Sequence, residues 1–109
     1  MAQVRKRQAA KSDLIAQWDW YAENAGVEVA DRFLAAAEST ALMLASQPES
    51  GVRVSTTKTE LAGLRRFPMS NGFEKIHFFY FPIPYGIDLI RVVHGNRELD
   101  RLLITGFFG

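Results

Sequence analysis

The chain has 109 residues, enough for one hydrophobic core and too few for two independently folding domains, so we expect a single domain over residues 1–109. Hydrophobic residues make up 48% and charged residues 23%, a balance typical of globular proteins. We therefore expect a folded chain and not a disordered one. Thirteen basic and twelve acidic residues give a formal net charge of +1, so the composition does not support direct binding to nucleic acid or to a membrane.

The chain contains no cysteine, which excludes disulfides, thiol nucleophiles and thiolate metal ligands. Its basic N-terminal segment, MAQVRKRQAAKSD, has no apolar stretch of the kind that secretory signals carry. No apolar run approaches the roughly 18 residues that can span a bilayer. We therefore expect a cytoplasmic protein.

A short strand over residues 3–7 and two helices are predicted in the first half of the chain. Over residues 9–24, apolar residues recur at helical spacing, at Leu14, Ile15, Trp18, Tyr21 and Ala22. A second amphipathic run covers residues 27–46, with an apolar stripe of Ala30, Phe33, Leu34, Ala37, Ala41, Leu44 and Ala45. Because only a few residues separate the two runs, they should form an antiparallel helical hairpin.

The second half of the chain predicts three strands. A polar connection over residues 49–60 leads to a brief strand over residues 64–69. Two stronger strands, over 75–81 and 87–94, flank a turn at 82–86, which is typical of a β-hairpin with a loop of about five residues. Segregated helices and strands predict an α+β fold, in which the helical hairpin packs on a small, mostly antiparallel sheet. Residues 98–103 can form a last turn of helix, and residues 102–108 are an apolar tail.

Alternation about a turn near Pro84 and Tyr85 assigns the strand hairpin two faces. The face expected to pack on the helices comprises Ile76, Phe78, Tyr80, Ile87, Leu89, Arg91 and Val93. The opposite face comprises Lys75, His77, Phe79, Phe81, Asp88, Ile90, Val92 and His94. The aromatic residues of this second face would lie in water unless something covers them, so it is a candidate partner surface.

Arg91 and two tryptophans have specific expected environments. A buried guanidinium is tolerated only when it is paired, so Arg91 should form a structural ion pair with an acid of the helical hairpin. The acids considered are Asp19, Glu23 and Asp31. Trp18 follows Leu14 by four residues and should lie in the core, whereas Trp20 lies off that stripe and is a candidate exposed contact.

Five segments in this order carry a family resemblance: DLIAQWDWYAENAG, ADRFLAAAE, LASQPESGVR, LAGLRRFPM and LIRVVHGNREL. Together they resemble the ParE branch of the RelE/ParE toxin superfamily over nearly the whole chain. The resemblance implies the fold described above and a toxin of a type II toxin-antitoxin system, of the kind used in plasmid stabilisation. It further implies inhibition of DNA gyrase by direct binding, growth arrest, and neutralisation by a cognate antitoxin in a hetero-oligomer.

The RelE branch of this superfamily instead cleaves mRNA on the ribosome, using a basic cleft and a tyrosine or histidine near the C-terminus. By rough register, the basic positions of that branch correspond here to Arg65 or Arg66, Lys75 and Arg97. Its acid/base position falls on Leu103, which cannot transfer protons. The resemblance therefore favours a gyrase inhibitor without catalytic residues.

The alternative is a ribosome-dependent mRNA endoribonuclease that uses Lys75, His94 and Arg97. His94 is the nearby substitute for the missing group, because imidazole titrates near neutral pH. A bond from His94 to the backbone or to Asp100 is the structural explanation of the same residue. Since His77 and His94 have no third ligand, the sequence predicts neither a metal site nor a cofactor.

The residues themselves suggest contact candidates for each partner, since the resemblance supplies no well-defined motif for the gyrase contact. Candidates for the antitoxin are Phe79, Phe81, Ile90, Val92, Phe107 and Phe108, and those for the target are Trp20, Arg65, Arg66, Lys75 and Arg97. Because Arg65 and Arg66 are adjacent on a strand, at most one of them can join Lys75. A third hypothesis is a relative that has lost its toxicity and survives as a binding module.

Overall fold

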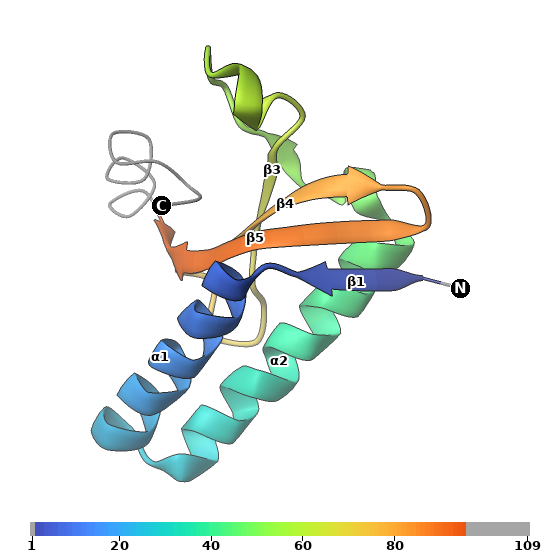
Figure 1. Ribbon diagram of the computed structural model, residues 1–109. Coiled ribbons are helices and arrows are strands. Elements are labelled where there is room, and N and C mark those ends of the chain that lie inside the picture. Colours follow the sequence, from blue (N-terminus) through green and yellow to red (C-terminus); the bar gives the residue numbers. More distant parts are fainter. Residues whose placement is uncertain (1, 96–109) are drawn as a thin grey trace.

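The computed structural model describes residues 2–95, which form a mixed five-stranded sheet with a helical hairpin on one face (Figure 1). The elements are β1 (Gln3–Lys6), α1 (Gln8–Asn24), α2 (Val27–Ser46), β2 (Val52–Arg53), β3 (Arg65–Pro68), β4 (Ile76–Ile83) and β5 (Gly86–His94). The strand order is β1-β5-β4-β3-β2, with β1 parallel to β5 and the other pairs antiparallel. The predicted α+β fold is confirmed. The predicted helical turn at 98–103 and the tail at 102–108 lie outside the described residues.

The two helices begin and end within one residue of the predicted positions. Gly26, which links them, has a φ of 99°, a conformation that favours glycine. Small residues on the buried face of α2 let it pack closely on the sheet, and they include Ala30, Ala36, Ala37, Ala41 and Ala45. Leu34 was assigned to the apolar stripe of α2 but is 42% exposed, so that assignment is wrong. No helix within residues 2–95 is long and apolar enough to cross a bilayer.

β4 and β5 are joined by a two-residue turn at Pro84 and Tyr85, which is shorter than the predicted loop. The pairing shifts between Phe79, which lies opposite Arg91, and Tyr80, which lies opposite Leu89. Ile90 is therefore an extra residue on β5, a β-bulge that reverses the facing of every later side chain on that strand.

Because of the bulge, the side chains that follow Ile90 on β5 lie on the faces opposite to those predicted. Val92, assigned to the open face, packs in the cluster beneath the helices, and Val93, assigned to the helix face, packs in the opposite cluster. Arg91, like Val93, therefore lies off the row of core residues that faces the helices. Alternation alone cannot reveal such a change, because a bulge breaks the period of two on which it depends.

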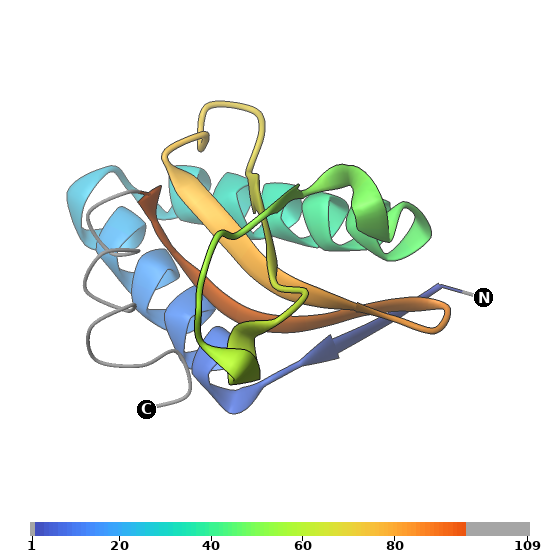
Figure 2. The same cartoon turned by 90° about the horizontal axis from the view of Figure 1, so that it is seen from above.

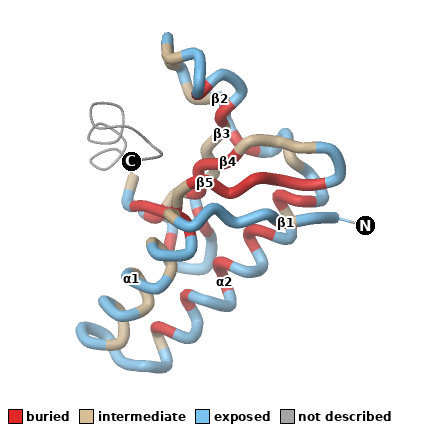
Figure 3. Tube along the Cα trace, in the orientation of Figure 1, coloured by how far each residue is buried: buried red, intermediate tan, exposed pale blue. Residues whose placement is uncertain are grey.

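A second hydrophobic cluster lies on the sheet face opposite the helices. Leu61 and Leu64, from the segment before β3, cover Phe79, Ile90 and Val93 there. Figure 2 shows the segment around residues 59–61 and helix α2 on opposite sides of the sheet, and Figure 3 shows β4 and β5 as the most continuously buried strands. Phe79 therefore does not lie in water: this segment covers it, its exposed fraction is 0%, and it cannot contribute to a partner surface there.

The polar connection contains structure that was not predicted, namely β2 and 3-10 helices at Pro48–Ser50 and Thr59–Leu61. Tyr80 anchors this connection to the sheet. Its buried hydroxyl donates to the carbonyl oxygen of Pro48 at 2.7 Å and accepts from the amide of Gly51 at 2.8 Å. A side chain at Gly51 would collide with that hydroxyl, because an added Cβ would lie 2.5 Å from it. These contacts hold the start of β2 beside β3.

Candidate functional site

A cleft of about 1030 Å³ opens between α1 and the end of the sheet where β4 begins and β5 ends. Helix α1 contributes Asp13, Ala16, Gln17 and Trp20 to its wall. The strands and their flanks contribute Arg66, Glu74, Lys75, His77, Arg91, Val92, Val93, His94 and Gly95. The cleft therefore gathers several of the predicted target-contact and catalytic candidates from distant parts of the chain.

One face of α1 forms the helical wall of the cleft. Asp13, Gln17 and Trp20 are spaced four and three residues apart, which places them on one side of a helix. Trp20 is 54% exposed and its ring meets Tyr21 edge to face, with ring centres 5.3 Å apart. An exposed indole at the rim can stack on or pack against a partner.

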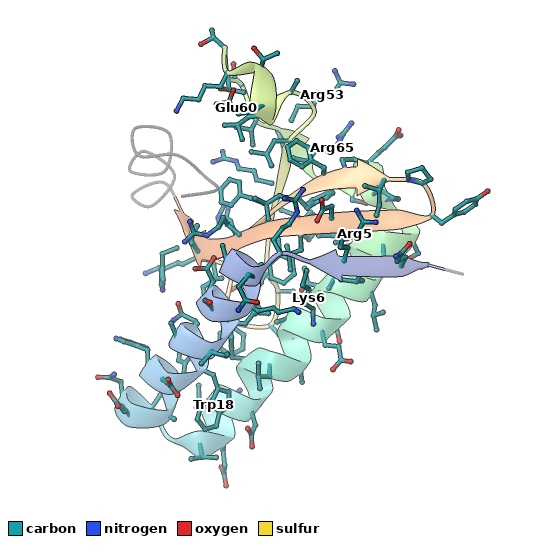
Figure 4. All side chains as sticks on the ribbon, in the orientation of Figure 1. Arg5, Lys6, Trp18, Arg53, Glu60 and Arg65 are labelled. Carbon is teal, nitrogen blue, oxygen red and sulfur yellow. The ribbon has the colours of Figure 1, made fainter. Side chains whose placement is uncertain are left out.

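Trp18 does not lie in the core, contrary to the prediction. It is half-buried, and its Nε1 donates to Oδ1 of Asp31 on α2 at 3.2 Å. Figure 4 shows Trp18 near the end of the helical hairpin that lies away from the sheet. The indole thus bridges the two helices near their connection and is not part of the cleft.

Asp13 and Arg91 form a bidentate ion pair that ties α1 to β5. Nε of Arg91 donates to one carboxylate oxygen of Asp13 at 2.7 Å, and Nη2 donates to the other at 2.9 Å. The amide of Val92 also donates to Asp13, at 2.9 Å. The side chains are only 17% and 14% exposed. Arg91 therefore pairs with an acid of the helical hairpin, but that acid is none of the three considered from the sequence.

The pairing of Arg91 leaves Arg66 and Lys75 as the basic side chains of the cleft for which no ion pair forms within residues 2–95. The neighbouring acid, Glu74, is held in its own turn, where it accepts from the amide of Gly72 at 3.0 Å. Two cations in the same cleft, neither of them in an ion pair with another described residue, attract anionic groups. This is the electrostatic character of the candidate site.

Arg65 points away from the cleft, as expected for a residue adjacent to Arg66 on a strand (Figure 4). Its Nη1 donates to the carbonyl oxygens of Glu49 and Gly51, at 3.1 and 2.6 Å. These bonds brace the connection after α2. The structure thus brings Arg66, but not Arg65, together with Lys75.

His77 has an unusual environment within the cleft. Its Nδ1 is buried and has no hydrogen-bond partner in the described part of the chain. Burial, and then the nearby charge of Arg66, lower the pKa of His77 from its ordinary value of 6.5. The imidazole is therefore mostly neutral at pH 7 and adds little positive charge to the cleft. His94 lies opposite Ile76 at the end of β5, exposed at the cleft.

The lowered pKa of His77 predicts a loss of stability in mild acid. The imidazole of the unfolded chain takes up its proton near pH 6.5, whereas that of the folded chain does so only at a lower pH. As the pH decreases from about 6.5 to the pKa of the folded state, the free energy of unfolding therefore decreases. Above about pH 6.5 the contribution of the neutral imidazole is fully present. Urea unfolding at about pH 7.5 and about pH 5.5 should give a larger decrease for the wild type than for His77→Asn. Equal decreases in the two proteins would contradict this account of His77.

Three of the antitoxin-contact candidates, Phe79, Ile90 and Val92, are buried inside the molecule. Phe81 is half-buried against the second cluster, and Phe107 and Phe108 lie outside the described residues. Arg97 and Leu103, which bear on the choice between the two branches, also lie outside them. Within residues 2–95, the large apolar side chains that are exposed are Ile15, Trp20, Val27, Leu34, Leu42, Val52 and Tyr85.

Asp13 and Gln17 are cleft residues that the sequence did not single out. The available signal was their spacing from Trp20, which places all three on one helical face. His77 was considered only as a metal ligand. Within residues 2–95, no group of three histidine, cysteine, aspartate or glutamate side chains comes close enough to hold a metal ion.

Comparisons with known proteins bear on the family. The profile described as "ParE toxin of type II toxin-antitoxin system, parDE" matches residues 4–99. A solved chain titled "Chromosomal ParDE TA system from P. aeruginosa" is similar in fold, with a TM-score of 0.69 and 17% sequence identity. The match covers 88% of this chain and 98% of that one. No curated protein sequence matches. Because the family profile spans almost the whole chain, the chain belongs to the ParE toxin family of type II toxin-antitoxin systems.

Proposed function

We propose that this toxin inhibits DNA gyrase by direct binding, performs no chemistry of its own, and is neutralised by a cognate antitoxin. The proposal combines the family membership with the target-contact candidates that line the cleft. A cytoplasmic site of action follows from a gyrase target. Growth arrest is the expected outcome in cells that lack the antitoxin.

One observation carries the proposal: exposed Trp20 lines the same cleft as the basic residues Arg66 and Lys75. Tryptophan and arginine are the residues that most often dominate the energy of protein interfaces. Arg66 and Lys75 form no ion pair within residues 2–95, so they are available for acidic groups of a target. We therefore propose the cleft as the surface that contacts gyrase.

The second candidate function is a ribosome-dependent mRNA endoribonuclease. The observation in its favour is that Lys75 and His94 line the same cleft, with His77 beside them. A cation could stabilise the anionic transition state of phosphodiester cleavage, and an imidazole could transfer the proton. This candidate predicts that His94→Ala abolishes toxicity, because it removes the proton-transfer group.

The two functions are distinguished in cells in which the toxin is induced without its antitoxin. The gyrase proposal predicts growth arrest, relaxed plasmid DNA and intact transcripts. The endoribonuclease alternative predicts cleaved transcripts and a harmless His94→Ala variant. Normal growth at high expression would instead indicate a binding module that has lost its toxicity.

A further inference from the structure

The turn between β4 and β5 holds a tyrosine in an unfavourable backbone conformation. Within residues 2–95, Asn71 and Tyr85 are the non-glycine residues with a positive φ, and Tyr85 has a φ of 66°. Asparagine tolerates this left-handed region, whereas a bulky aromatic residue rarely adopts it. Pro84 fixes a negative φ just before it, so the pair has the signs of a type II turn, in which glycine or asparagine normally stands in the place of Tyr85. The backbone is therefore strained at Tyr85.

The side chain of Tyr85 does not stabilise the fold in return for this strain. It is 82% exposed, the largest exposed fraction among the large apolar side chains within residues 2–95. The backbone does contribute, because the carbonyl oxygen of Tyr85 accepts from the amide of Gln3 at 2.7 Å. Glycine or asparagine would supply that carbonyl oxygen equally well. Strain retained beneath an exposed aromatic side chain is typical of a functional site.

The support that carries this side chain is apolar and rigid. Residues 82–85 are Pro-Ile-Pro-Tyr, although two-residue hairpin turns are usually built from glycine, asparagine and aspartate. The two prolines have a fixed φ. Gly86 is held against β1, since an added Cβ there would collide with the carbonyl oxygen of Gln3. The ring of Tyr85 is therefore presented on a preorganised turn, which reduces the entropy lost when a partner binds it.

A hollow of about 510 Å³ lies beside the turn. Pro82 and Ile83 form one of its walls, and residues 47–50, in the connection after α2, form the other. An exposed aromatic side chain next to a hollow is a shape that a folded partner can match over more area than one side chain provides. The tip of the hairpin thus has the form of an interaction surface.

We propose that Tyr85 is an anchor residue of the gyrase contact and that its ring enters an apolar socket on the enzyme. This inference rests on the proposed inhibition of gyrase and adds a second contact to the cleft. Figure 1 shows the turn and the end of β5 at opposite ends of the strand hairpin. At about 3.3 Å per residue, the eight residues of β4 separate the two contacts by roughly 25 Å.

The shape of the tip favours a folded target over a segment of the antitoxin. A convex side chain needs a concave partner, and sockets of this kind are a feature of folded proteins. A peptide segment instead needs a groove on the toxin in which it can lie. Tyrosine suits the role of an anchor, because it buries a large ring and its hydroxyl can form a hydrogen bond. The expected socket is therefore apolar, with a polar group at its base.

The test replaces Tyr85 by residues that suit its backbone. Tyr85→Gly and Tyr85→Asn both relieve the strain, so their midpoints of unfolding in urea should equal or exceed that of the wild type. Their inhibition of supercoiling by purified gyrase should nevertheless weaken by at least about tenfold, because the ring is lost. Tyr85→Phe keeps both the ring and the strain, so its inhibition should stay closer to that of the wild type than either of the other variants does.

Leu34→Gln is the matched control, because Leu34 is an exposed apolar side chain on α2, outside the turn. It should inhibit gyrase as the wild type does. Wild-type inhibition by the folded Tyr85→Gly and Tyr85→Asn variants would overturn the inference and leave gyrase inhibition intact. The same result with weaker binding to the cognate antitoxin would assign Tyr85 to that partner instead. Lower urea midpoints for both variants would contradict the strain from which the inference starts. A wild-type toxin that leaves gyrase active would overturn the proposed function on which it rests.

Discussion

Asp13→Ala is expected to lower the free energy of unfolding by about 3 kcal/mol, because it removes the carboxylate that forms a bidentate ion pair with the guanidinium of Arg91 in a largely buried site. It also leaves the amide of Val92 without an acceptor, and Val92 is only 2% exposed. Both losses fall on the contact between α1 and β5. Urea unfolding followed by circular dichroism measures the effect.

The matched control is Asp19→Ala on the same helix, where the carboxylate is exposed and forms no ion pair within residues 2–95. We expect that change to stay within about 0.5 kcal/mol. Combining Asp13→Ala with Arg91→Met should recover part of the loss, because it also removes the largely buried guanidinium that the carboxylate compensates. Equal destabilisation by Asp13→Ala and Asp19→Ala would show that the ion pair does not hold α1 to the sheet.

Arg66→Glu combined with Lys75→Glu is expected to reduce gyrase inhibition by at least about tenfold, because it reverses the charge of the cleft. These side chains form no ion pair within the described residues, so the folded state should survive. The measurement is the toxin concentration that halves supercoiling by purified gyrase. Circular dichroism of the variant checks that it remains folded.

Arg53→Glu is the matched control for the cleft variant, because Arg53 is basic, exposed and located on β2 outside the cleft. It should inhibit gyrase as the wild type does. If the cleft variant and the control inhibit gyrase equally well, the cleft is not the surface that contacts the target. The family assignment would stand in that case.

The helices were the most predictable part of the fold. Their signals are local, since the apolar spacing, Gly26 and Pro48 all lie within or next to the elements that they define. What this pattern could not predict was which apolar residues a neighbour covers. Leu34 and Ile15 have helical spacing but are exposed, at 42% and 64%, because no described element packs on them.

The strand faces were less predictable because they depend on partners distant in the sequence. One extra residue at Ile90 reverses the facing of Val92 and Val93, and the hydrophobic pattern around it contains no sign of the change. Phe79 is covered by Leu61 and Leu64, two apolar residues near the end of a mostly polar segment. Their presence there was the available signal that this segment folds over the sheet.

The candidate site was predicted in part. Trp20, Arg66, Lys75 and His94 were candidates from the sequence, and all four line one cleft. Asp13 was missed because its role depends on Arg91, which is 78 residues away. Residues so far apart in the sequence come into contact only when the helix packs against the sheet, so no local sequence pattern predicts the pair.

The central claim, that this toxin binds and inhibits gyrase, is tested most directly by supercoiling of relaxed plasmid with purified gyrase and purified toxin. We predict that a molar excess of toxin blocks supercoiling and that prior addition of the cognate antitoxin restores it. Full supercoiling at toxin excess would contradict the claim, provided that the same toxin arrests growth when it is expressed in cells.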